Sequence, residues 1–165
     1  MIIIEAKKED AQQIVELIYE VEQSGLMLFE PFERPKNVNG MKNRIEMVAK
    51  EDNSNIFLAE LDNKLVGYLF AFGGQSKRVK HVAYLVVGVS SEARGIGVGS
   101  RLFESLNEWA NRQRLKRLEL TVLKHNEVAI NLYKKNGFEI EGTKKHSLFV
   151  DGEFVDEYYL SKILK

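Results

Sequence analysis

The sequence reads Val89-Ser90-Ser91-Glu92-Ala93-Arg94-Gly95-Ile96-Gly97-Val98-Gly99-Ser100 where an apolar, strand-like run passes into an amphipathic helix. Three alternate glycines occupy this junction, and glycine lets a backbone turn tightly and come close to a ligand. The first amides of the following helix have no intrahelical partner, and the positive end of the helix dipole lies beside them. The junction therefore predicts a cradle for a phosphate-bearing cofactor.

Composition limits what else the chain can do. Its 165 residues, 44% of them hydrophobic, suit one domain spanning 1–165 with a sizeable core. Lys plus Arg and Asp plus Glu balance at 24 each, so bulk charge favours neither nucleic acid nor an anionic membrane as a partner. The chain has no cysteine, which excludes disulfides, thiolate metal sites and a thiol nucleophile. We expect no metal cofactor.

The apolar runs are all too short for membrane insertion. None approaches the roughly 18 residues of a membrane span, and the opening Met1-Ile2-Ile3-Ile4-Glu5 is too short for a signal sequence. We therefore expect a cytoplasmic protein.

Hydrophobic periodicity predicts an α/β chain. Strands are indicated at 2–6, 56–61, 65–72, 81–89, 118–123, 138–150 and 153–163, and helices at 8–22, 41–50, 99–112 and 126–135. The turn residues Asp62-Asn63-Lys64 and Asp151-Gly152 predict two antiparallel hairpins, so the sheet should be mixed.

Three of these segments carry more detailed predictions. The strand 81–89 is apolar at nearly every position, which is typical of a central strand buried on both faces. The helix 126–135 should bury one side, formed by Val128, Ala129, Leu132 and Tyr133. Residues 24–40 hold both prolines and several bulky apolar side chains, and predict a loop that either packs on the core or forms a substrate-side lid.

Two familiar phosphate-binding patterns fit the glycine junction poorly. A P-loop needs a lysine after its last glycine, and here Ser100 follows Gly99. A dinucleotide fingerprint starting at Gly95 would place Ser100 at its third glycine, with Glu119 downstream as the ribose-binding acid. Glu119, however, lies inside its strand and not at the end, so NAD binding is a weak alternative.

A third pattern fits at two separate places. The junction contains Arg94-Gly95-Ile96-Gly97-Val98-Gly99, and a later stretch reads Asn126-x-x-Ala129-x-x-Leu132-Tyr133-x-x-x-Gly137-Phe138. Together, and in this order, they resemble the GNAT superfamily of acetyl-CoA-dependent N-acetyltransferases. The resemblance implies a mostly antiparallel mixed sheet that splays at the cofactor strand and is flanked by helices. It leaves only residues 24–54 unconstrained.

The resemblance also implies a role for each motif residue. The strand backbone at Val87, Gly88 and Val89 should bind the pantetheine arm of acetyl-CoA. The pyrophosphate should lie on the amides of the turn, which comprises Arg94, Gly95, Ile96, Gly97, Val98, Gly99 and Ser100. Further cofactor contacts are implied for Asn126, Asn131 and Lys135. Tyr133 should contact the cofactor and protonate the departing thiolate as general acid, and its ordinary pKa of about 10 suits that role.

Most of these residues also have a purely structural interpretation. Gly88 indicates a bulge or a close ligand approach, but a glycine that only makes room for packing is almost as common. Asn126 is equally an N-cap, and Tyr133 has the spacing of a core residue. Arg94, Asn131 and Lys135 could simply face water.

The implied reaction is direct attack of a primary amine on the acetyl thioester, with the oxyanion held by a backbone amide near Val89. Some family members carry a glutamate early on the long strand, but this chain reads His81-Val82-Ala83-Tyr84-Leu85 there. The remaining candidates for a base are Glu119, His81 and His146.

The sequence leaves alternatives open for the function, the acceptor and the oligomeric state. A noncatalytic acyl-CoA-binding or regulatory module on the same fold is the alternative function. The acceptor could be a small-molecule amine or a protein amine, and the segment 150–159 looks more like bacterial small-molecule or ribosomal-protein acetyltransferases than histone enzymes. The last two strands could pair two copies as a homodimer, or could close the monomer's own sheet.

Overall fold

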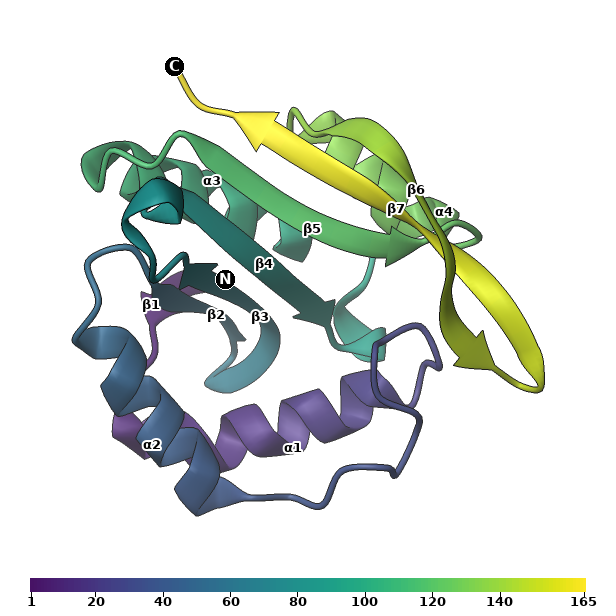
Figure 1. Cartoon of the computed structure of the whole chain (residues 1–165). Coiled ribbons are helices and arrows are strands. Elements are labelled where there is room, and N and C mark those ends of the chain that lie inside the picture. Colours follow the sequence, from purple (N-terminus) through teal and green to yellow (C-terminus); the bar gives the residue numbers. More distant parts are fainter.

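A computed structural model describes all residues, 1–165, as a seven-stranded mixed sheet with helices on both faces (Figure 1). The strands are β1 (Ile2–Glu5), β2 (Asn55–Leu61), β3 (Lys64–Gly73), β4 (Val82–Val89), β5 (Arg117–Leu123), β6 (Glu139–Val150) and β7 (Glu153–Ile163). Their order across the sheet is β1-β2-β3-β4-β5-β7-β6. Only β4 and β5 run parallel, which confirms the expected mixed, mostly antiparallel sheet.

The helices divide the core into two layers. They are α1 (Ala11–Glu22), α2 (Val38–Ala49), α3 (Val98–Arg112) and α4 (Glu127–Lys135). One apolar cluster joins α1 and α2 to one face of β2 and β3, and a larger cluster joins α3 and α4 to the other face. None of the four is both long and apolar enough to cross a membrane.

The hairpin turns follow from residues that tolerate positive φ. Asp62 and Asn63 have φ of 50° and 64°, and Asp151 and Gly152 have φ of 49° and 82°, as two-residue hairpin loops require. The first turn is thus shorter than expected, because Lys64 already belongs to β3. The second hairpin, β6–β7, lies beside β5 and closes the monomer's own sheet.

Three local predictions were wrong. The helix expected at 41–50 starts at Val38, because Asn37 caps it by accepting a hydrogen bond from the Gly40 amide at 2.9 Å. The segment 8–22 opens with a 3-10 turn at Lys8–Asp10 before α1 begins. On α4, Val128 is 80% exposed and Ile130 is buried in its place, so the buried side is rotated from the predicted one.

Candidate active site

The sheet splits between β4 and β5. Their pairing covers only Val82, Ala83 and Tyr84, opposite Arg117, Leu118 and Glu119. From Leu85 to Val89, β4 keeps its hydrogen bonds to β3 but has no strand on its other side. This confirms the expected splay, and it corrects the prediction that β4 is buried on both faces, because Tyr84 is 40% exposed where β5 departs.

The unpaired edge of β4 carries Val87, Gly88 and Val89. A free strand edge presents backbone donors and acceptors in the pattern that an extended ligand can continue. Gly88 lies in regular register opposite Tyr68, without a bulge. A Cβ on Gly88 would collide with the Tyr68 ring, so this glycine makes room for a buried aromatic side chain.

The glycine turn leaves the start of α3 open. Gly95 and Gly97 have φ of 78° and 85°, a left-handed conformation that L side chains rarely adopt. Gly97 is the N-cap and offers no side-chain acceptor, and the first helical hydrogen bond runs from the Arg101 amide to the Gly97 carbonyl at 3.1 Å. The amides of Val98, Gly99 and Ser100 therefore stay available for an anion.

The other members of the turn surround these amides. Arg94 and Ile96 are exposed, and Arg94 makes no salt bridge that would hold it elsewhere. Gly99 is buried against α4, since a Cβ there would lie 2.6 Å from Cδ2 of Leu132. Free amides beside an unpaired strand edge fit a pyrophosphate joined to an extended pantetheine arm.

Tyr133 projects from α4 into the larger core. Its ring packs edge-on against Phe103 at 5.8 Å and also lies against Phe138. The hydroxyl has no hydrogen-bond partner, yet it is not among the sealed polar atoms, so it reaches an opening. Burial, together with the nearby Tyr84, raises the pKa of Tyr133 to about 12, which keeps the phenol protonated.

The remaining cofactor candidates lie on α4. Asn126 is the N-cap, and its Oδ1 accepts a hydrogen bond from the Ala129 amide at 3.3 Å. That bond confirms the structural interpretation and leaves the Nδ2 donor free. Asn131 and Lys135 are four residues apart, on one exposed side of the helix, with no side-chain hydrogen bond.

The face of the sheet opposite Tyr133 carries contacts that the sequence did not predict. The Tyr84 hydroxyl lies 3.0 Å from Oγ1 of Thr121 and bridges the two strands just where they begin to diverge. At the far end of β4, Glu20 of α1 accepts hydrogen bonds from the amide and the hydroxyl of Ser91 at 3.1 and 2.8 Å. The carboxyl end of α1 is therefore fastened beside the glycine turn.

The loop between α1 and α2 belongs to this same side (Figure 1). Arg34 holds it to α1, donating to the buried Glu22 carboxylate at 3.0 Å. Of its bulky residues, Met27 packs on the core, whereas Leu28 and Phe32 are 71% and 68% exposed. Part of the loop therefore packs on the core, as one interpretation predicted, while the substrate-side lid stays a prediction.

None of the three candidate bases has both an unpaired side chain and a position beside the unpaired edge of β4. Glu119 lies on β5 with its carboxylate 2.7 Å from Nε of Arg117. His81 precedes β4, at the end of the strand away from the glycine turn. His146 is exposed on β6 and stacks on Phe154 at 5.3 Å.

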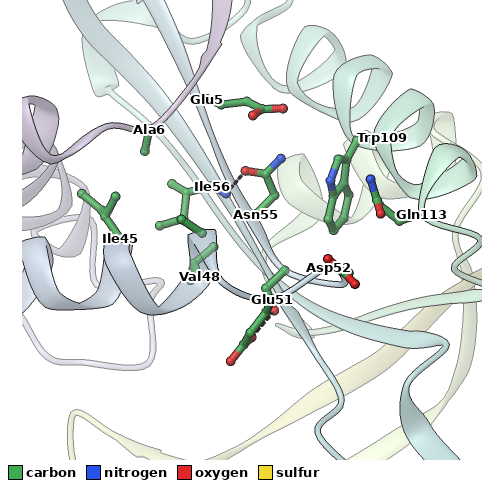
Figure 2. Close-up of a pocket in the computed structure, with 12 residues that line it drawn as sticks. Glu5, Ala6, Ile45, Val48, Glu51, Asp52, Asn55, Ile56, Trp109 and Gln113 are labelled. Carbon is green, nitrogen blue, oxygen red and sulfur yellow. Dashed lines mark hydrogen bonds between the residues drawn. The ribbon is translucent and has the colours of Figure 1, made fainter.

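A cavity of about 280 Å³ lies at the opposite end of the sheet (Figure 2). It is bounded by the end of β1, α2, the start of β2 and the end of α3, where Trp109 stands between Asn55 and Gln113. The 15 residues of α3 separate this end from the glycine turn by about 20 Å. No predicted site residue lines this cavity, so it is separate from the candidate active site.

Known proteins match the chain in sequence and in fold. Residues 16–138 match the model of the Acetyltransferase (GNAT) family. The L-amino acid N-acetyltransferase AaaT of Escherichia coli (strain K12) is 39% identical over 119 residues, which cover 72% of this chain and 74% of that protein.

Two solved structures extend the match over nearly the whole chain. A GNAT-family acetyltransferase from Streptococcus pneumoniae superposes with a TM-score of 0.94 and 30% identity, covering 99% of both chains. A phosphinothricin acetyltransferase from Sinorhizobium meliloti, solved in complex with acetyl-CoA, shares the fold with a TM-score of 0.88 and 21% identity, covering 99% of this chain and 88% of that one.

Proposed function

The chain belongs to the acetyltransferase (GNAT) family, and from that premise we propose that it transfers the acetyl group of acetyl-CoA directly to a primary amine, with Tyr133 as general acid. Family membership makes it an acetyl-CoA-dependent N-acetyltransferase. The direct attack, the acid and the class of amine are the parts that we propose.

One observation carries this assignment. The unpaired edge of β4 leads directly to the uncapped amides of α3, and Tyr133 is close enough to Tyr84, where the split begins, for Tyr84 to help raise its pKa. In the proposed arrangement, Val87, Gly88 and Val89 hold the pantetheine arm, and the amides and Arg94 of the turn hold the pyrophosphate. A backbone amide near Val89 would then donate to the carbonyl oxygen on which negative charge develops.

The phenol suits the leaving-group step. A proton must reach the sulfur as the carbon–sulfur bond breaks, and a hydroxyl with a pKa of about 12 is protonated throughout the neutral range. Bulk solvent returns the proton to Tyr133 afterwards. No covalent enzyme intermediate is required, which agrees with the absence of cysteine.

We propose a small amine, such as the amino group of an amino acid, as the acceptor. The support is the likeness to an L-amino acid N-acetyltransferase. The α-amine at a peptide N-terminus, with a pKa near 8, needs about 1 kcal/mol to become neutral at pH 7, whereas a lysine-like amine needs about 4 to 5 kcal/mol. The α-amine of a free amino acid is more basic than a peptide N-terminus, so its cost lies between these two values. Pairing of two copies through β6 and β7 stays a prediction that light scattering can test.

The test combines cofactor binding with turnover. Titration calorimetry should give a defined affinity for acetyl-CoA, and a panel of L-amino acids, spermidine and a lysine-containing peptide should release coenzyme A from it. A thiol reagent reads this release directly because the chain contains no thiol of its own. Tight acetyl-CoA binding without release by any amine would favour an acyl-CoA-binding module, and absence of binding would refute the proposal.

A further inference from the structure

Glu157 on β7 is a buried carboxylate without a partner. The residue is 9% exposed, and its side chain takes part in no hydrogen bond and no salt bridge. Buried charges in proteins are ordinarily paired, because an unpaired one is costly. The neighbouring Asp156 has a structural task, since its Oδ1 accepts a hydrogen bond from the His146 amide at 2.8 Å. Glu157 has none.

Strand alternation places Glu157 on the face opposite Tyr133. On the same strand, Tyr158 and Leu160 pack into the larger apolar cluster, on the side of α3 and α4. Glu157 therefore faces the other way, toward the side of α1 and of the loop that follows it. Directly opposite it are Leu123 on β5 and Lys144 on β6.

The strand register also shows which residues of β4 lie at the same height along the sheet as Glu157. Tyr84 pairs with Glu119 in the parallel direction, so four residues further along both strands Gly88 comes level with Leu123. Leu123 pairs with Glu157. Glu157 thus stands level with the unpaired edge of β4, about two strand spacings or 10 Å away plus the width of the split. A small amine and one ordered water can span that gap.

The carboxylate is open to a ligand. Among side-chain polar atoms without a hydrogen-bond partner, only Ser147 Oγ is completely covered. The Glu157 oxygens also lack a partner, so they must keep some exposure to solvent. A mostly buried carboxylate that is neither paired nor covered is available to a cationic ligand.

We propose that Glu157 binds the ammonium group of the acceptor and accepts its proton. This rests on the proposed function, because the split must hold acetyl-CoA for the amine to have a target. Binding supplies the charge partner that the fold withholds from Glu157. One N–H proton passes to the carboxylate, directly or through a water molecule, and then to solvent.

The bond changes then balance. The nitrogen lone pair attacks the acetyl carbon and the carbon–sulfur bond breaks. The acylated nitrogen then gives its second proton to solvent, the thiolate takes a proton from Tyr133, and solvent returns a proton to Tyr133. The net products are the N-acetyl amine, coenzyme A and one released proton. The assignment supplies the base that the long strand lacks, since Tyr84 occupies the part of that strand where some family members carry glutamate.

The carboxylates of α1 on this face have partners, since Glu20 accepts hydrogen bonds from Ser91 and Glu22 pairs with Arg34. Lys144 lies opposite Glu157 but makes no salt bridge with it, and its ammonium is 6.0 Å from the Tyr159 ring. Glu119 stands on the same face, nearer the start of β5, and is held by Arg117. Glu157 is therefore the unengaged carboxylate closest in register to the unpaired edge of β4.

The test compares Glu157→Gln with Glu153→Gln, an exposed glutamate on the same strand. We expect the first change to lower kcat/KM for the best amine of the panel by about 10²-fold or more at pH 7, with the acetyl-CoA Kd unchanged. The deficit should shrink as the pH approaches the pKa of the amine, because solution then supplies the neutral form. The control should match the wild type.

Stability gives an independent readout. Removing an unpaired buried charge should keep the Tm of Glu157→Gln equal to that of the wild type or raise it by about 2–4 °C. A lowered Tm with equal loss at every pH would make Glu157 a structural residue and overturn the proposal, as would wild-type kinetics. If the amide variant does not fold, Glu157→Asp should raise KM for the amine about 10-fold, and an unchanged KM would overturn it.

Failure of this inference differs from failure of the proposed function. If the wild type neither binds acetyl-CoA nor acetylates an amine, the proposed function itself fails. If the wild type does both and Glu157→Gln does so equally well, only the role of Glu157 fails.

Discussion

Two helices begin after parallel strands in this molecule, and their first turns are built differently. After β4, the N-cap of α3 is Gly97, which has no side chain to offer, so three amides stay open. After β5, the N-cap of α4 is Asn126, whose Oδ1 occupies the Ala129 amide. An uncapped helix start costs stability, and a fold keeps one where the free amides have another use.

The start of α3 packs against the middle of α4. Leu132 of α4 fills the space over Gly99 of α3, and Tyr133 follows it on the same helix. In the proposed mechanism α3 supplies the anion site and α4 supplies the proton. Substitutions on the two helices should therefore separate affinity from rate.

The largest effect is expected on α4, from Tyr133→Phe. Losing the phenol should lower kcat by about 10²- to 10⁴-fold without changing the acetyl-CoA Kd, because a general acid acts only during the reaction. Burial raises the pKa of Tyr133 to about 12. Deprotonation of Tyr133 should therefore not reduce the wild-type kcat at any pH below about 11. Steady-state kinetics and calorimetry measure both. Tyr19→Phe serves as control, and an unchanged kcat in Tyr133→Phe would assign the proton to water.

A smaller effect, on affinity, is expected on α3 from Gly97→Ala. Alanine at φ of 85° costs about 1 to 2 kcal/mol and distorts the turn, so Kd for acetyl-CoA should rise about 10-fold while kcat at saturation changes little. Gly142→Ala is the matched control, because nothing lies within 4 Å of its Cβ position and its φ is not positive. Equal Kd values for the two variants would show that the glycine turn does not contribute to acetyl-CoA binding.

The different N-termini of α3 and α4 could be predicted from the sequence, but the detailed arrangement of the strands around them could not. Alternate glycines and an Asn followed by a helical pattern are local signals, and both starts were predicted within a residue or two. The Asp151-Gly152 turn likewise indicated the hairpin of β6 and β7, although it sets the register only as far as Leu148 opposite Val155, and the register shifts twice beyond that pair. The family resemblance implied that the sheet splays at the cofactor strand, but not that β5 leaves β4 after the Tyr84–Glu119 pair. That position depends on how the whole sheet twists, which no short segment encodes.

Side-chain partners across the sheet were also beyond the sequence. The burial of Ile130 in place of Val128 depends on the angle at which α4 meets the core. The Tyr84–Thr121 and Glu22–Arg34 contacts join distant segments. The isolation of Glu157 is a property of its neighbours, although alternation from the predicted turn could have indicated which face it occupies.

A still smaller effect is expected from Arg94→Gln, which removes the charged side chain of the glycine turn 94–100. If Arg94 contacts the cofactor phosphates from its exposed position, its loss should weaken acetyl-CoA binding about 5-fold at low salt, and less at high salt. Calorimetry at two ionic strengths measures this difference. Arg112→Gln, at the other end of α3, should change neither value. A salt-independent loss would indicate a distorted turn instead of a lost phosphate contact.

The smallest effect is expected from Asn126→Asp, which tests whether the capped helix start also binds the cofactor. Aspartate caps a helix as well as asparagine does, so the free energy of unfolding should stay within about 0.5 kcal/mol of the wild type. What aspartate lacks is the free Nδ2 donor, and it adds a negative charge. If that donor meets acetyl-CoA, Kd should rise a few-fold with kcat unchanged. Asn126→Ala separates the two roles, because it removes the cap and should lower the unfolding free energy by about 1 kcal/mol. An unaltered Kd in Asn126→Asp would restrict Asn126 to capping and leave α3 as the helix that binds the anion.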